Sequence, residues 1–378
     1  MRLTKTSTLA HSTLGVVDLV RNLLAEAKNR GASDIHIAPG ISDVRIRMRV
    51  DGVLSDFLRT PLILHGEIVS RIKVLSGLRT DEHQAAQDGR FRFTFPDTEE
   101  FFDIRVSIVP AYYGEHIVLR LLRDTALHHS LSSLGFSAAD EKKIAAATER
   151  SQGMILSTGP TGSGKTTTLY AILKALNTED VSIVTIEDPV EYAITGIEQI
   201  QVNARTGLTF ANGLRSILRQ DPNIIMVGEI RDHETAGIAV NTALTGHLLL
   251  STLHTNDAAT TLPRLLDMGI DPYRVASTVS IAIGQRLVRT LCSQRKKGKT
   301  KGDGCDVCQG SGYKGRTSIN EILVADPDIR AAIMKKASAA ELRAIAIKNG
   351  MTTMQEDGFK KAEEGITTKE EVLRVIHE

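Results

Sequence analysis

The feature that most constrains this 378-residue chain is a glycine-rich loop placed between an apolar strand and a helix. The loop, at 159–166, reads GPTGSGKT and matches the phosphate-binding pattern GxxxxGK[ST]. The apolar run MILST precedes it at 154–158, and the helical run TTTLYAILKAL follows it. A strand that feeds such a loop into a helix is typical of an α/β fold with a parallel sheet. The loop therefore predicts a domain that binds a nucleoside triphosphate.

Each residue type in this loop has a role in holding phosphate. Glycines let backbone N–H groups surround an anion, and the N-terminus of the following helix adds its dipole. We expect Lys165 to reach the β- and γ-phosphates and the Thr166 hydroxyl to ligate Mg²⁺. The predicted nucleotide contacts are Gly159, Pro160, Thr161, Gly162, Ser163, Gly164, Lys165, Thr166 and Thr167.

Two glutamates follow apolar segments that read as later strands of the same sheet. Glu187 ends VTIE and Glu229 follows IIMVG. Because ligands of open α/β sheets bind at the carboxyl edge, either carboxylate is a candidate to orient the attacking water. Taken alone, each could instead be a charge at a helix N-terminus. Gly228 stands where many P-loop ATPases carry a Mg²⁺-binding aspartate, so the metal is expected to depend on Thr166, phosphate and water, with Glu187 or Glu229 acting through water.

Changes in hydrophobic periodicity divide the chain into five segments. The first is α+β, with a strong hairpin signal at Asp51-Gly52. The second is rich in Ser and His and lacks periodicity, which indicates a linker. In the third, strands alternate with helices, which predicts a parallel sheet with helices on both faces. The segments are the α+β lobe 1–122, the linker 123–136, the P-loop core 137–285, a cysteine-containing loop and strand segment 286–325, and amphipathic helices 326–378.

Composition excludes several classes of protein. The chain has 46 Lys+Arg and 45 Asp+Glu, a net charge of +1, which argues against direct binding of nucleic acid through overall positive charge. A hydrophobic content of 42% is enough to build a core. Three cysteines cannot form a disulfide framework, which fits a reducing compartment. We see no signal peptide and no apolar run of about 18 residues, so we expect a cytoplasmic protein.

Four motifs, in this order, resemble those of the secretion-superfamily ATPases, the hexameric motors of type II secretion and type IV pilus assembly. They are GPTGSGKT (159–166), TIEDPVEY (185–192), LRQDPNIIMVGEIRDHET (218–235) and TGHLLLSTLHTNDA (245–258). Upstream, GASDIHIAP (31–39), IRMRVDGVL (46–54), RIKVLSGL (71–78), QDGRF (87–91) and DIRVSIVPAYYGEHIVLRLL (103–122) resemble the domain that precedes the motor in this family. The resemblance implies a RecA-like P-loop ATPase domain, a smaller α+β, PAS-like N-terminal domain before it, and C-terminal helices. Gly228 before the glutamate is itself a trait of the family.

The resemblance also implies roles for residues around ATP and Mg²⁺. Glu229 would be the general base that activates water, and Glu187 would help to place that water or the Mg²⁺. His247 and His254 would lie near the γ-phosphate and report its presence. Taken alone, the two histidines, which flank an apolar strand, would more often be structural.

Two arginines of the first lobe match residues that the family brings over the γ-phosphate. These are Arg105 and Arg120, and a guanidinium there would stabilise negative charge in the transition state. Without the resemblance, arginines on strands would more often form a solvated face. Arg45, Arg47 and Arg49 are interpreted as such a face or as an interface.

The three cysteines, Cys292, Cys305 and Cys308, lie in one segment rich in Gly and Lys. Members of the assembly and secretion branch often carry a four-cysteine zinc loop here. In this chain the fourth position is Arg295, and three thiolates make a weaker structural site than four. We therefore favour a metal-free loop over Zn²⁺. The seven cations of 286–302 are interpreted as a solvated loop, with a contact to anionic lipid as the alternative.

From the motifs and the family resemblance we expect an ATPase that assembles as a homo-hexamer and works on an inner-membrane platform protein during type IV pilus assembly or type II secretion. We expect its partners to hold it at the periphery of that membrane. The alternatives are a pilus retraction motor, which the cysteine segment disfavours, a DNA-uptake or translocation ATPase, and a nucleotide-binding scaffold without turnover. Assembly and secretion relatives usually carry a further N-terminal docking domain, which we expect this chain to lack.

Overall fold

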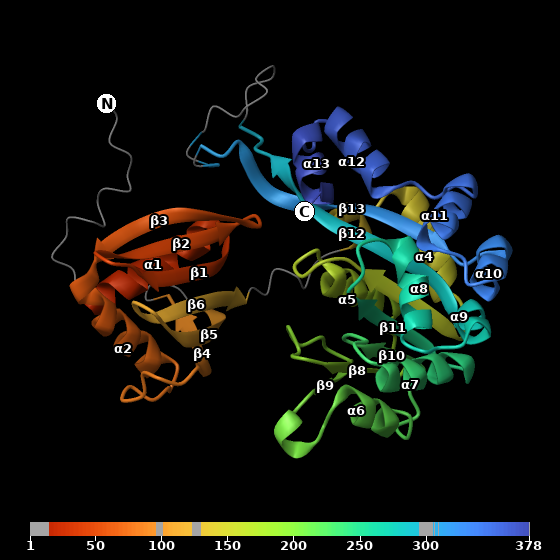
Figure 1. The fold of residues 1–378 in the computed structure, drawn as a ribbon, viewed down its shortest axis with the longest axis horizontal. Helices are drawn as coiled ribbons and strands as arrows, with labels where there is room; N and C mark the ends of the chain where they lie inside the picture. Colours follow the sequence, from red (N-terminus) through yellow and green to blue (C-terminus); the bar gives the residue numbers. More distant parts are fainter. Residues whose placement is uncertain are drawn as a thin grey trace. The chain divides into compact units, whose positions relative to one another are not determined.

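The structure is a computed structural model that describes residues 15–95, 101–122, 130–294, 305, 307–308 and 310–377. The chain divides into two compact units, Met1–Thr125 and Ala126–Glu378 (Figure 1). Across the described ranges, no helix is both long and apolar enough to cross a membrane.

The N-terminal unit is an antiparallel sheet with two main helices. The strands lie in the order β3-β2-β1-β6-β5-β4, and every neighbouring pair is antiparallel. Asp51 and Gly52 form the predicted turn between β2 and β3, and both have positive φ. The elements are α1 (Val16–Arg30), β1 (Ala32–Pro39), β2 (Asp43–Val50), β3 (Val53–Pro61), η2 (Leu62–Leu64), α2 (His65–Leu75), β4 (Gln87–Thr94), β5 (Phe101–Ala111) and β6 (Gly114–Leu122).

One face of this sheet is apolar and the other is polar, because side chains alternate along each strand. Leu23 and Leu24 of α1 and Ile72 of α2 pack against the apolar face. Ile35 and Ile104 are among the strand residues in the same core. The opposite face carries the predicted arginines of β2, β5 and β6.

The second unit is built on a seven-stranded sheet in the order β13-β12-β7-β11-β10-β8-β9. All neighbouring pairs are parallel except β12–β13, which is antiparallel. Its strands are β7 (Gly153–Thr158), β8 (Ile183–Glu187), β9 (Glu198–Gln201), β10 (Ile224–Val227), β11 (Leu248–Leu253), β12 (Val279–Leu291) and β13 (Tyr313–Val324). The predicted parallel sheet is confirmed.

Helices cover both faces of this sheet, as predicted. On one side, residues of α6 to α11 pack on Leu156 and Val227, and on the other, α4 and α5 pack on Ile155 and Met226. The helices are α3 (Leu131–Leu134), α4 (Ala138–Thr148), α5 (Lys165–Leu176), η4 (Ala204–Thr206), α6 (Phe210–Ile217), α7 (His233–Leu244), α8 (Ala258–Asp267), α9 (Pro272–Thr278), α10 (Pro327–Met334), α11 (Ala339–Lys348), α12 (Met354–Glu363) and α13 (Lys369–His377).

A buried polar cluster ties α12 to the start of this unit. Lys361 of α12 donates to the backbone oxygens of Gly135 and Ser318, both at 2.6 Å, and to Asp357 at 2.7 Å. Asp357 also accepts the backbone N–H of Asn320 at 2.9 Å. The C-terminal helices therefore hold both β13 and the segment that follows α3.

The structure differs from the predicted segments in two places. The predicted linker 123–136 contains α3, which is capped by Ser130, and Phe136 is buried in the core of the second unit. Residues 130–136 lack a sustained apolar period, but Leu131, Leu134 and Phe136 still pack in the core of the second unit. The predicted boundary at 285/286 falls inside β12, which is one continuous strand over Val279–Leu291.

Candidate nucleotide-binding site

The P-loop leaves β7 at Thr158 and enters α5 at Lys165. Gly159, Gly162 and Gly164 all have positive φ, which only glycine adopts freely. At Gly159 a side chain has no room, since a Cβ would lie 2.5 Å from the backbone oxygen of Gln285. These glycines let the loop turn tightly, as a phosphate cradle requires.

Lys165 is buried within the loop, with 8% of its surface exposed. Its Nζ donates to the backbone oxygens of Gly159 at 2.8 Å and Pro160 at 3.0 Å. Burial lowers the pKa of Lys165 to about 8, and the charge of Glu229 opposes that shift. A phosphate at the loop would give this ammonium an anionic partner in place of neutral carbonyls.

The loop also contains a hydroxyl that lacks a partner. Ser163 Oγ is buried and makes no hydrogen bond in the structure. A buried polar group without a partner is costly, so it indicates that a ligand atom completes the site. Thr166 and Thr167 are partly buried residues of the first turn of α5. The residues present therefore fit a bound phosphate with Mg²⁺.

Glu229 stands two residues beyond the end of β10, at the carboxyl edge of the sheet. It is 9% exposed, and its Oε2 lies 3.2 Å from Nε2 of His254. Its Oε1 forms an ion pair with Arg231. His254 follows β11, whose last residue, Leu253, pairs in register with Thr158 of β7. The register therefore brings Glu229 and His254 to the same edge as the P-loop.

Gly228, which precedes this glutamate, has a steric reason to be glycine. Its N–H donates to the backbone oxygen of Ile186 at 2.7 Å. A Cβ at Gly228 would lie 3.2 Å from that oxygen and 3.3 Å from Cα of Glu187. β8 and β10 therefore approach so closely here that an aspartate does not fit without a shift.

Glu187 ends β8 and is almost fully buried. Its Oε1 accepts from Thr185 Oγ1 at 2.6 Å and from Gln199 Nε2 at 3.1 Å. Its Oε2 accepts the hydroxyl of Tyr170, a residue of α5. Burial and this carboxylate raise the pKa of Tyr170. Both oxygens of Glu187 thus accept hydrogen bonds from protein donors, and these donors do not include Lys165 or Thr166. The role of Glu187 toward water or Mg²⁺ stays a prediction.

β12 supplies two site residues that the sequence analysis did not identify. Gln285 Oε1 accepts from Thr168 Oγ1 at 2.9 Å, and the Gln285 backbone oxygen abuts Gly159. Arg286 is 9% exposed, and burial lowers the pKa of its guanidinium while Glu321 and Asp257 raise it. Its charge also acts on Lys165. No local motif marks these residues, because their proximity arises from the pairing of β12 with β7.

The structure does not bring His247 to this site, contrary to the prediction. His247 precedes Leu248, the first residue of β11, and Leu248 pairs with Gly153 at the start of β7. With about 3.3 Å per strand residue, it lies roughly 20 Å along the sheet from the P-loop edge. Its Nδ1 lies 3.3 Å from the backbone oxygen of Thr242. The two histidines of one motif therefore occupy opposite edges of the sheet, since the strand separates them.

Arg105 and Arg120 belong to the N-terminal unit. They face each other across β5 and β6, where they are register partners. Arg120 Nε donates to Asp34 Oδ1 at 3.1 Å. The structure therefore places the two predicted γ-phosphate arginines side by side on one sheet face, and their action on a nucleotide stays a prediction.

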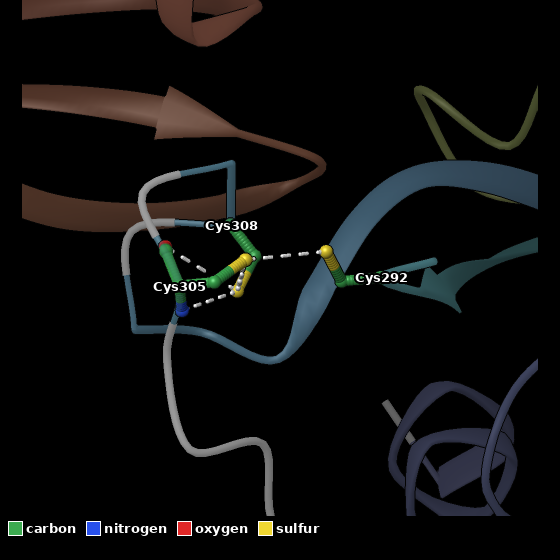
Figure 2. Close-up of side chains that lie close together, drawn as sticks. All are labelled: Cys292, Cys305 and Cys308. Carbon is green, nitrogen blue, oxygen red and sulfur yellow. Dashed lines mark hydrogen bonds between the residues drawn. The ribbon is translucent and has the colours of Figure 1, made fainter. Parts of the chain in front are cut away.

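The three cysteines lie together (Figure 2). Cys305 Sγ is 3.6 Å from Cys292 Sγ and 3.4 Å from Cys308 Sγ, and all three sulfurs lie within 4.8 Å of one another. Burial opposes ionisation of Cys308, but backbone N–H donors, with that of Cys305 first, outweigh it and lower its pKa to about 7. Three thiols at this spacing fit a soft metal such as Zn²⁺. Arg295, at the predicted fourth position, lies outside the described residues.

Comparisons with known proteins identify the family to which the chain belongs. The family described as "Type II/IV secretion system protein" matches residues 10–374. The chain is 44% identical to the type IV pilus assembly ATPase PilB of Myxococcus xanthus, with 95% of this chain and 67% of that protein covered. It is 46% identical to the type II secretion system protein HxcR of Pseudomonas aeruginosa, with 96% and 78% covered.

Among solved structures, the pilus retraction motor PilT with bound ADP is similar at a TM-score of 0.66 and 27% identity, with 93% of this chain and 95% of that chain covered. At this coverage the similarity extends over both units of the chain. The chain belongs to the type II/IV secretion system protein family.

Proposed function

We propose that this chain is an ATP-hydrolysing motor subunit that powers type IV pilus assembly or type II protein secretion. The observation that supports it most is the buried carboxylate of Glu229 at the sheet edge that also carries the P-loop. ATPase activity agrees with the family and with the relatives that are named ATPases.

In the proposed reaction, Lys165 and the N–H groups of the loop hold the phosphates of ATP. Thr166 would hold Mg²⁺, which supplies charge neutralisation on the β- and γ-phosphates. The Glu229 carboxylate accepts a proton from the attacking water. Arg231 and His254 both contact this carboxylate, so they fix its orientation at the edge of the sheet.

Arg105 and Arg120 are proposed to stabilise the charge that develops on the γ-phosphate. Such arginines also couple the nucleotide state to the position of the domain that carries them, which a motor requires. We further propose, from the family resemblance, a PAS-like fold for the N-terminal unit, assembly as a homo-hexamer, and action on an inner-membrane platform protein.

The geometry of the three cysteines favours zinc more than the sequence pattern does. We propose that Cys292, Cys305 and Cys308 bind Zn²⁺, with a fourth ligand from outside these side chains. Metal analysis of the purified chain should give close to one zinc per chain, and Cys305→Ser should lose it. A wild-type chain without zinc after purification in metal-replete medium would reject this site.

Retraction is the second candidate function, because the solved structure of a retraction motor is similar over both units. A deletion strain complemented with the wild-type chain or with Glu229→Gln separates the two. An assembly or secretion motor predicts that the variant lacks surface fibres or exported protein. Excess fibres with the variant would instead establish retraction, and no phenotype in the deletion strain would reject both.

A further inference from the structure

The polar face of the N-terminal sheet contains one row of charged residues that crosses five strands. Asp34 of β1 pairs in register with Arg49 of β2 and with Arg120 of β6. Arg120 pairs with Arg105 of β5, and Arg105 pairs with Arg90 of β4. Directly opposed residues in an antiparallel sheet point to the same face, about 5 Å apart. The row therefore contains four arginines and one carboxylate, and Arg49 and Arg120 are the two arginines directly beside that carboxylate.

That carboxylate is much less exposed than two other aspartates of the sheet that pair with arginines. The side chain of Asp34 is 10% exposed, whereas Asp56 and Asp103, which pair with other arginines of the sheet, are 47% and 49% exposed. Asp34 Oδ2 accepts from Ser33 Oγ at 2.8 Å and lies 3.6 Å from Arg49 Nε. Ser33 and Arg49 thus hold the Asp34 carboxylate in place, so this carboxylate can in turn orient a third side chain.

The third side chain is that of Arg120, which contacts Asp34 through Nε and not through its Nη groups. Asp34 Oδ1 accepts from Nε of Arg120 at 3.1 Å, while 59% of the Arg120 side chain is exposed. A guanidinium held through Nε keeps its plane and direction fixed but leaves its two Nη groups available to a second anion. Arg120 is therefore oriented before any phosphate arrives.

We propose that Asp34 is a positioning residue for ATP hydrolysis, which holds Arg120 in the orientation that engages the γ-phosphate. This inference rests on the proposed role of Arg120. Asp34 does not itself touch the nucleotide. Asp34 contributes by orienting Arg120 in advance, so the arginine loses no side-chain freedom when the reaction occurs. A misplaced charge near a reacting group lowers the rate rather than the affinity for substrate.

The test uses the full chain with Mg-ATP and four variants: Asp34→Asn, Arg120→Ala, the double variant, and Asp56→Asn as the matched control. Asp34→Asn keeps the shape of the side chain but weakens the bond to Nε. We expect kcat to fall by on the order of tenfold with KM for ATP within about twofold. The control, whose partner is Arg45 on the same sheet, should retain wild-type kcat.

The double variant distinguishes positioning from a general structural effect. If Asp34 acts through Arg120, Asp34→Asn should add no further loss of kcat in the Arg120→Ala background. If Asp34→Asn does not fold, Ser33→Ala, which removes one donor to the carboxylate, should lower kcat by about threefold.

Three results would overturn the proposal, and they are separable. Wild-type kcat in Asp34→Asn, or a loss that multiplies with that of Arg120→Ala, would reject positioning by Asp34 while the role of Arg120 stands. An equal loss in Asp56→Asn would show that any charge change on this face has the same effect. Wild-type kcat in Arg120→Ala would reject the proposed role of the arginine itself, and with it the need to position it.

Discussion

Replacing Lys361 with methionine tests whether the buried cluster on α12 fixes the start of the second unit. Lys361 is 7% exposed and donates three hydrogen bonds, to Gly135, Ser318 and Asp357. Without the ammonium, two backbone oxygens lose a donor and Asp357 becomes a buried charge without its partner. Burial already raises the pKa of Asp357, and Lys361 is the main influence that opposes it.

The structure allows the size of this effect to be estimated. Removing one partner of a buried ion pair costs about 3–5 kcal/mol, because the other charge is left uncompensated. In the double variant Lys361→Met/Asp357→Asn, the charge is gone and the amide oxygen can still accept from the N–H of Asn320. That variant should therefore lose only about 1–3 kcal/mol, which reflects the unsatisfied carbonyls.

Chemical denaturation of the purified chain, followed by circular dichroism, measures both values. Lys360→Met is the matched control, because Lys360 is the neighbouring and exposed lysine on the same helix. We expect the control to stay within about 0.5 kcal/mol of wild type. A free energy of unfolding for Lys361→Met within about 1 kcal/mol of wild type, or a double variant less stable than Lys361→Met, would refute this account of the cluster.

Three further predictions concern residues beside the nucleotide-binding site and an ion pair that stabilises the second unit. Gly228→Ala should lower the free energy of unfolding by about 1–3 kcal/mol, because its Cβ meets the backbone of β8; unchanged thermal denaturation would contradict the steric explanation. Tyr170→Phe should cost about 1–3 kcal/mol, since it leaves Glu187 Oε2 without a donor, and an unchanged Tm would show that water replaces the hydroxyl. Burial raises the pKa of Glu371, but hydrogen bonds from Arg374 and Arg289 outweigh burial and lower this pKa from 4.5 to about 2. The stability it contributes, about 3 kcal/mol, is thus present above pH 4.5 and lost as the pH falls toward 2. A pH titration of unfolding should therefore be flatter for Glu371→Gln, and equal slopes would reject the assignment.

The sequence predicted the parts of the site that local patterns encode. The P-loop needs a strand, a loop and a helix that are adjacent in the chain, so its glycines, Lys165 and Thr166 could be placed without a structure. The parallel sheet followed from strands that alternate with helices. Glu229 could be placed at the carboxyl edge because it directly follows an apolar strand.

Other features depend on contacts between distant segments, and local patterns do not reveal them. Gln285 reaches the P-loop only because β12 pairs with β7, more than a hundred residues earlier. The contact of Asp34 with Arg120 likewise depends on the pairing of two distant strands, β1 and β6, so no local pattern predicts it. His247 lies away from the P-loop because the six residues of β11 separate the two histidines of this motif and carry them to opposite ends of the strand.

ATP hydrolysis by this chain is proposed to use Glu229 as the base. Its most direct measurement is phosphate release from Mg-ATP by the purified chain, compared with Glu229→Gln and with Glu234→Gln, an exposed glutamate on α7 that pairs with Arg215. We predict turnover in wild type and in Glu234→Gln, and a loss of at least about a hundredfold in Glu229→Gln with nucleotide affinity retained. Wild-type turnover in Glu229→Gln would contradict the claim.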